Sequence, residues 1–251
     1  MSKFLIKQAF AEAMDLHKQN RFEEAKAIYN KIITVNESEP NAHHLISLIF
    51  MAEGDFDNAK KHIEIAIEKA PEQAVFRSNY GSLLHSMGEN QLAINAIKIS
   101  LRLDKKLFQS YYSLGIIYTD MQEHEKAVDN YVKALEINSE SSEAHNNLGN
   151  MLREAGRLAE SETNLKKALA LKPQYLKAHN NLGVSLREMG RLEEAVSSLR
   201  QAIKLDPNYD EAHGNLGVTL QEMDRLEEAE ASYKKAIAIN PNYAKAYSNL
   251  A

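Results

Sequence analysis

One stretch of the chain decides its fold: residues 142–175 read SEAHNNLGNMLREAGRLAESETNLKKALALKPQY. Its Leu-Gly pair recurs every 34 residues, at Leu114-Gly115, Leu148-Gly149, Leu182-Gly183 and Leu216-Gly217. Tyr80-Gly81 stands one period earlier and Leu250-Ala251 one period later, without any insertion or deletion. A strict period near 34 residues indicates supersecondary units that stack on their neighbours. The sequence therefore predicts an array whose function lies on a repeated surface rather than in one catalytic pocket.

The units begin at Ile6 and then at every thirty-fourth residue. They span residues 6–39, 40–73, 74–107, 108–141, 142–175, 176–209 and 210–243, with a partial unit at 244–251. We number the positions of each unit from 1 to 34. Apolar or small residues fall at positions 4, 7, 8 and 11, and again at 17, 20, 24, 27, 28 and 30. Each set forms one helical face, so each unit is predicted to be two amphipathic helices joined by a tight turn.

Glycine and proline support these boundaries. Nine of the ten glycines occupy two positions of the repeat. At position 15 they would provide the C-cap of the first helix, as at Gly156. At position 8 they lie inside that helix, as at Gly149, which indicates a close approach of the second helix at the small residues of position 20. Proline at position 32, such as Pro173, would follow the end of the second helix.

Composition excludes several classes of function. The 251-residue chain has a net charge of −5 with mixed acidic and basic residues, which argues against a nucleic-acid partner. It has no cysteine. The sequence also has no membrane-spanning segment or signal peptide, so we expect a cytoplasmic protein without a membrane partner.

No catalytic motif is evident, so the chain is interpreted as non-catalytic and without a cofactor. His145, His179 and His213 share position 4 and suggest a metal site. Packed helices are about 8–10 Å apart, whereas zinc ligands lie about 2 Å from the metal. Three histidines one repeat apart therefore cannot share an ion. We expect them to be packing residues, and we predict no metal site.

The repeat resembles the tetratricopeptide repeat (TPR) family. The resemblance rests on Leu-Gly at positions 7 and 8, Gly at 15, Ala at 20, an aromatic residue or Leu at 24, Ala at 27 and Pro at 32. It covers residues 6–251, although the first unit departs from it with Glu12 and Ala13 at positions 7 and 8. It implies an all-α, right-handed superhelix of seven helix pairs and one trailing helix, forming a single domain over residues 1–251.

A second stripe of the first helix, at positions 2, 5, 6, 9, 12 and 13, lines the concave groove in TPR proteins. Position 6 carries a ladder of polar side chains: Asn79, Ser113, Asn147, Asn181, Asn215 and Asn249. Side-chain amides donate and accept hydrogen bonds, and one per unit suits the backbone of an extended peptide. The predicted peptide-binding residues are this ladder together with Tyr112, Asn150, Arg153 and Arg187. The alternative is that asparagine is simply a common, solvent-facing residue at position 6.

The ladder also resembles that of O-linked N-acetylglucosamine transferases, in which groove asparagines hold substrate peptides. Residues 13–50 look like the N-terminus of bacterial TPR-containing glycosyltransferases and sulfotransferases. This chain would then recruit substrates for a catalytic domain elsewhere. Apolar stripe residues, including Leu45, Leu48 and Met51, would form a peptide pocket or a self-association patch, or pack under the next helix. A chaperone-type carboxylate clamp is disfavoured because position 5 never carries lysine.

The chain ends at position 8 of a first helix, with Tyr247 and Leu250 on its packing face. An array end normally carries a polar cap. We therefore expect the chain to be a fragment of a longer protein. A further alternative is a structural module that forms homo-oligomers end to end through this uncovered helix. The favoured partner is a protein or an extended peptide.

Overall fold

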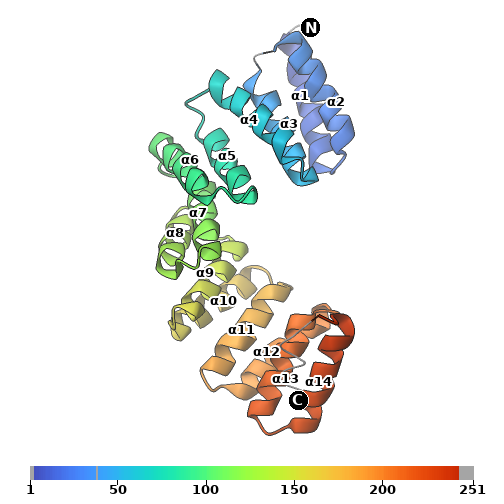
Figure 1. The fold of residues 1–251 in the computed structure, drawn as a ribbon, viewed down its shortest axis with the longest axis vertical. Coiled ribbons are helices and arrows are strands. Elements are labelled where there is room, and N and C mark those ends of the chain that lie inside the picture. The colour runs from blue at the N-terminus through green and yellow to red at the C-terminus, as the bar shows by residue number, and fades with distance from the viewer. Residues whose placement is uncertain (1–2, 38, 243–251) are drawn as a thin grey trace. The chain divides into compact units, whose positions relative to one another are not determined.

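The computed structural model describes residues 3–37 and 39–242, which form fourteen α-helices and no strand (Figure 1). The first seven are α1 (Lys3–Lys18), α2 (Phe22–Val35), α3 (Pro40–Glu53), α4 (Phe56–Lys69), α5 (Ala74–Ser86), α6 (Asn90–Leu103) and α7 (Phe108–Asp120). The others are α8 (His124–Ile137), α9 (Ser142–Glu154), α10 (Leu158–Leu171), α11 (Leu176–Glu188), α12 (Leu192–Leu205), α13 (Asp210–Glu222) and α14 (Leu226–Ile239). The predicted all-α fold of seven helix pairs is confirmed. The partial unit at 244–251 lies outside the described residues.

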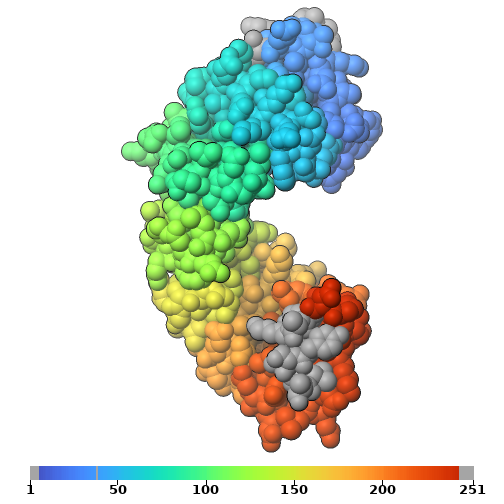
Figure 2. Space-filling model, viewed as in Figure 1, coloured from blue at the N-terminus to red at the C-terminus, as the bar shows by residue number. Residues whose placement is uncertain are grey.

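Contacts within the chain divide it into two compact units, which we call unit 1 (residues 1–117) and unit 2 (residues 118–251). The boundary between them in the sequence falls within α7. In unit 1 the pairs α1–α2, α3–α4 and α5–α6 pack together. In unit 2 the pairs are α9–α10, α11–α12 and α13–α14, which follow one another in chain order in the yellow, orange and red parts of Figure 2. A single domain over the whole chain stays a prediction.

First helices of successive repeats also touch directly. The contacts join α3 to α5 in unit 1, and α9 to α11 and α11 to α13 in unit 2. Side chains on the stripe of one repeat can therefore reach those of the next.

The helices begin at the same positions in almost every repeat. Helices α3, α5, α7, α9, α11 and α13 begin at position 1, and all seven second helices begin at position 17. Helix α1 is the exception, since it begins at Lys3 rather than Ile6. This first helix is therefore three residues longer at its N-terminal end than the repeat predicts.

The turn within each repeat is a Schellman motif. The N–H of position 16 donates to the carbonyl of position 11 at 2.8–2.9 Å in all seven repeats. Position 15 has a positive φ throughout. It is glycine in four repeats, with φ of 75–80°, and Asn20, Gln122 or Asp224 in the others, with φ of 58–59°. Gly54 is the C-cap residue of α3, as predicted, whereas Gly88, Gly156 and Gly190 lie one residue beyond the C-caps of α5, α9 and α11.

Glycine at position 8 gives the second helix room to approach. A Cβ added to Gly149 would lie 2.6 Å from Leu165 Cγ at position 24 and 3.2 Å from the Ser161 carbonyl oxygen at position 20. Leu165 and Ser161 are both fully buried. The predicted close approach is present, but its nearest partner is the side chain of position 24. The small residue at position 20 contributes its backbone.

The core is a series of small clusters between successive helices. One joins Val196 and Leu199 of α12 to Leu216, Leu220 and Tyr233 of α13 and α14. Positions 17 and 30 do not always belong to this core. Leu226 is 59% exposed, and position-30 residues such as Leu103, at 44%, are also exposed. These two positions lie at the ends of the second helix, where fewer neighbours cover them. None of the described helices is both long and apolar enough to cross a membrane.

Candidate binding face

The predicted binding residues lie on the first helices, at positions 2, 5, 6, 9, 12 and 13, which we call the first-helix stripe. These positions share one helical face because they are three or four residues apart. In unit 2 the stripe runs over α9, α11 and α13. In unit 1 it includes α5 and the first part of α7. Asn249 lies outside the described residues.

In unit 2 the ladder asparagines bond to the preceding repeat. Asn181 Nδ2 donates to Asn146 Oδ1 at 3.0 Å, and Asn215 Nδ2 donates to Asn180 Oδ1 at 3.0 Å. Asn146 Nδ2 also donates to Asn147 Oδ1 at 3.1 Å. The ladder is thus hydrogen-bonded from repeat to repeat through position 5.

Burial separates the two asparagine positions. Asn146 and Asn180 at position 5 are each only 4% exposed, whereas Asn147, Asn181 and Asn215 at position 6 are half-buried. The position-6 amides are therefore the ones that a partner can reach. Sequence reasoning did not assign a role to position 5. The available signal was the Asn-Asn pair at positions 5 and 6, which places an acceptor 35 residues before each donor.

Unit 1 makes the same link with a different residue. Asn79 Nδ2 lies 2.7 Å from Nε2 of His44, at position 5 of the preceding repeat. The amide donates, so this Nε2 carries no hydrogen and the imidazole is neutral. The His44 ring also packs against the Phe76 ring, with centroids 4.4 Å apart and the two planes tilted by 31°. Burial, and secondarily the nearby His17, lowers the pKa of His44 to about 4.

The other predicted residues of unit 1, Ser113 and Tyr112, differ in exposure. Ser113 is 5% exposed, and its hydroxyl lies 3.1 Å from Ser82 Oγ and accepts from Gln109 Nε2 at 3.3 Å. The half-buried Tyr112 ring stacks on Phe108, with centroids 5.5 Å apart. The structure therefore places Ser113 in packing contacts rather than at the surface.

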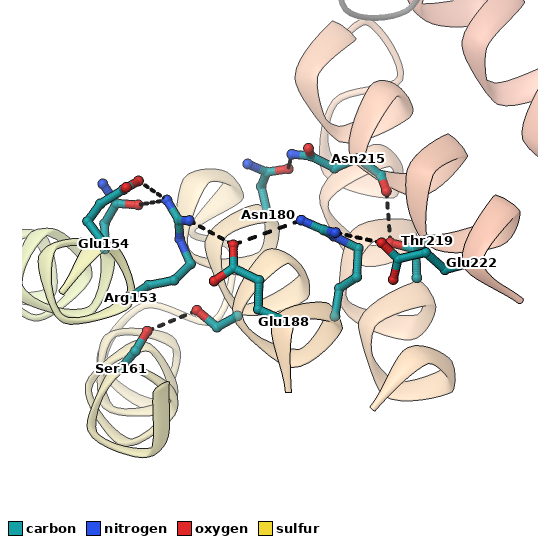
Figure 3. A network of polar contacts seen from close by, with 11 residues as sticks. Arg153, Glu154, Ser161, Asn180, Glu188, Asn215, Thr219 and Glu222 are labelled. Atoms are coloured by element: carbon teal, nitrogen blue, oxygen red, sulfur yellow. Dashed lines mark hydrogen bonds and ion pairs between the residues drawn. The ribbon is translucent and has the colours of Figure 1, made fainter. Parts of the chain in front are cut away.

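Arg153 and Arg187 form a second link between repeats; Figure 3 shows Arg153 beside Glu188. Arg153 Nη1 donates to Glu188 Oε1 at 2.9 Å, and Arg187 Nη1 donates to Glu222 Oε1 at 2.7 Å. Arg153 also donates to Asn150 Oδ1 at 3.2 Å and pairs with Glu154. Position 12 of one repeat thus pairs with position 13 of the next. Neighbouring carboxylates offset these two guanidinium charges.

The histidines at position 4 anchor the loops between repeats. Nε2 of His145, His179 and His213 lies 2.9–3.1 Å from the backbone carbonyl six residues earlier. A carbonyl only accepts, so Nε2 donates. Their role is to hold the preceding loop. Among the described residues, no group of three His, Cys, Asp or Glu side chains is arranged to hold a metal ion.

The stripe of unit 2 thus combines half-buried amides on three adjacent helices with ion pairs at the helix ends. Neutral amides bind through hydrogen bonds and do not transfer protons or act as nucleophiles. The arrangement suits recognition of polar groups on another molecule.

Family models described as tetratricopeptide repeat match the chain at residues 13–39, 44–106, 106–174, 140–208 and 186–251. Together these matches cover nearly all of the predicted array. None of the curated proteins compared with the chain matches it.

Several solved structures share the fold. YrrB, described as a TPR protein with an unusual peptide-binding site, is 28% identical over 74% of this chain and 96% of its own, with a TM-score of 0.63. MamA is 25% identical over 66% of this chain and 96% of its own, with a TM-score of 0.60. PilF of Pseudomonas aeruginosa is 15% identical over 83% of this chain and 95% of its own, with a TM-score of 0.74, and shows the fold alone.

Proposed function

We propose that this chain, which belongs to the tetratricopeptide repeat family, is a protein-interaction module without catalytic activity of its own. The partner is an extended peptide or protein segment that lies along the first-helix stripe of unit 2. The observation that carries the proposal is the row of half-buried amides of Asn147, Asn181 and Asn215, one on each of three adjacent first helices. The peptide-binding site named for YrrB supports it.

The chemistry of the row suits a peptide backbone. Each amide offers donors and an acceptor, as does each peptide group. Each hydrogen bond contributes about 0.5–1.5 kcal/mol to binding. Three in register therefore give useful affinity with little dependence on the partner's side chains. Because Arg153 and Arg187 are paired with Glu188 and Glu222, the stripe is not a phosphate-binding surface.

Two alternatives remain predictions from the sequence. Recruitment of substrates for a transferase would use the same face, but the structures compared above are TPR proteins rather than transferases. Its test is a catalytic domain in the parent reading frame. End-to-end self-association through Tyr247 and Leu250 concerns residues outside the described part of the chain. Its test is sedimentation at several protein concentrations.

The proposal is tested with a displayed library of random 12-residue peptides selected on the immobilised protein. Peptides that bind the wild type are then titrated against Asn147→Ala/Asn181→Ala. Loss of two hydrogen bonds should weaken binding by about 5- to 150-fold. The double variant also removes both partners of the buried Asn146 amide, so its melting temperature should fall, and binding is measured below that temperature.

The matched control is Asn130→Ala/Gln201→Ala, which removes two polar side chains from the second helices α8 and α12. It should bind the same peptides as the wild type does. If the ladder variant also binds like the wild type, or if the library yields no binder, the proposal is wrong.

A further inference from the structure

Asn146 and Asn180 are too enclosed to meet a partner themselves. At 4% exposure, their amides are directed to other side chains of the stripe. Both use Oδ1 to accept a hydrogen bond from the ladder asparagine of the next repeat. A buried amide without such a bond is unfavourable, because it has given up its hydrogen bonds to water. Their burial and their bonds therefore belong together.

We propose that Asn146 and Asn180 are positioning residues, which fix the amides of Asn181 and Asn215 before a partner arrives. This inference rests on the proposed function, in which those ladder amides contact the partner. An asparagine amide can rotate about χ2 and has two nearly equivalent orientations, exchanged by a flip. An Oδ1 acceptor selects one of them, because only Nδ2 can face it. The bound order of donor and acceptor is thus set in the free protein, identically at both rungs.

The chain contains an internal comparison. His44 occupies position 5 in unit 1, and its Nε2 faces Asn79 Nδ2 at 2.7 Å. A histidine nitrogen and an asparagine oxygen have little in common except that both accept a hydrogen bond. In these three repeats position 5 therefore supplies an acceptor, which is what orienting the next amide requires.

The two positioning residues differ in the number of ladder asparagines that they contact. Asn146 contacts two ladder residues, Asn181 through Oδ1 and Asn147 through Nδ2, whereas Asn180 contacts Asn215. Ordering one freely rotating side chain on binding costs about 0.5–1.5 kcal/mol, which is about 2- to 10-fold in affinity per rung. Asn146→Ala should therefore weaken binding more than Asn180→Ala.

The first experiment needs no ligand. Nitrogen-15 relaxation of the asparagine side-chain amides reports their order in the free protein. Asn146→Ala should lower the order of the Asn181 amide and leave Asn215 unchanged, and Asn180→Ala should do the reverse. Asn146→His, which copies the residue of unit 1, should restore the order of Asn181. A general loosening of the fold would affect both rungs alike, and an unchanged Asn181 amide in Asn146→Ala would overturn the inference.

The second experiment titrates a peptide selected from the 12-residue library against the same variants, below their melting temperatures. Weaker binding by Asn146→Ala and Asn180→Ala, with recovery in Asn146→His, supports the positioning role. If these variants bind like the wild type while Asn147→Ala/Asn181→Ala does not, the inference is wrong and the proposed function stands. If the ladder variant also binds like the wild type, the proposed function fails and the inference fails with it.

Discussion

Position 24 shows how one residue type meets different surroundings in different repeats. Tyr131 and Tyr233 place their hydroxyls 3.2 Å from Thr119 Oγ1 and 2.8 Å from Gln221 Oε1, at position 12. Tyr29 is fully buried, and its hydroxyl has no hydrogen-bond partner within the described part of the chain. Position 12 of its repeat is His17. Burial raises the pKa of Tyr29 to about 12.

Tyr29→Phe should therefore raise the free energy of unfolding, by about 1 kcal/mol or less, because it removes an unpaired buried hydroxyl. The matched variant Tyr233→Phe should lower it by about 1 kcal/mol, since it breaks a hydrogen bond and leaves Gln221 without that donor. Urea unfolding of both variants measures the difference. A loss of stability in Tyr29→Phe equal to that in Tyr233→Phe would show that the two hydroxyls are equally satisfied.

Gln122 holds a backbone conformation better suited to glycine. Its φ is 58°, and four other repeats have glycine at this position. The left-handed region is unfavourable by about 1–2 kcal/mol for a residue with a Cβ, and glycine removes this strain. Glycine also makes the unfolded chain more flexible, which offsets part of the gain. Gln122→Gly should therefore stabilise the folded chain by about 0.5–1 kcal/mol.

The control for this change is Gln201→Gly in the middle of α12, which should be destabilising by about 1 kcal/mol. Thermal unfolding of the two variants should shift in opposite directions. A shift in the same direction would mean that the turn conformation of Gln122 is not strained.

At the scale of helices, the repeat period predicts the boundaries well, because each boundary depends on local chemistry. Gly156 takes a left-handed conformation just after α9, and Pro173 follows the end of α10. Burial is predicted less well because it depends on neighbours in space. The sequence pattern placed position 17 in the core, yet Leu226 is 59% exposed.

The candidate site shows the same division. Periodicity placed Asn147, Asn181 and Arg153 on the same face of their first helices, as observed. It did not reveal that Asn146 accepts from Asn181, or that Arg153 pairs with Glu188. Those contacts depend on the stagger between adjacent first helices, which no single repeat contains.

The approach of α9 and α10 depends on the missing side chain at Gly149. Gly149→Leu should lower the free energy of unfolding by about 1–3 kcal/mol through overpacking, although leucine is the better helix former. A Cβ there already lies 2.6 Å from Leu165 Cγ. Denaturant unfolding gives the value.

Ala170→Leu, on the exposed face of α10, is the matched control and should change stability by less than about 0.5 kcal/mol. If Gly149→Leu leaves the free energy of unfolding unchanged, α9 and α10 can move apart without a loss of stability.

At the scale of the whole molecule, acid should act on unit 1 through His44 and His62. Burial is the main cause that lowers the pKa of each to about 4, from an ordinary value of 6.5. His17 adds to the effect at His44, and His43 and Lys61 add to it at His62. Both groups bind protons less readily in the folded chain than in the unfolded one. Their contribution to stability is therefore complete above pH 6.5 and is lost as the pH falls towards 4.

Between pH 7 and pH 4.5, unit 1 should lose about 2–3 kcal/mol through His44. His44→Asn, which installs the position-5 residue of unit 2, should keep the bond to Asn79 and remove this part of the pH dependence. Hydrogen exchange measured at both pH values, in the wild type and the variant, resolves the effect by helix. Equal acid sensitivity of α3 and α5 in the two proteins would contradict the assignment to His44.

The links between repeats join residues 35 apart, one more than the period of the chain. This offset has a consequence for how such a chain can change by duplication. Consider a duplication of one whole repeat, such as residues 176–209. Each donor of the new copy then lies beside an acceptor of the neighbouring repeat, in both the amide links and the ion-pair links. The new repeat therefore packs against its neighbours without further substitution. Inserting or deleting a single residue in a first helix shifts every link across that junction. Recombination in steps of 34 residues is therefore the change in length that the stripe tolerates.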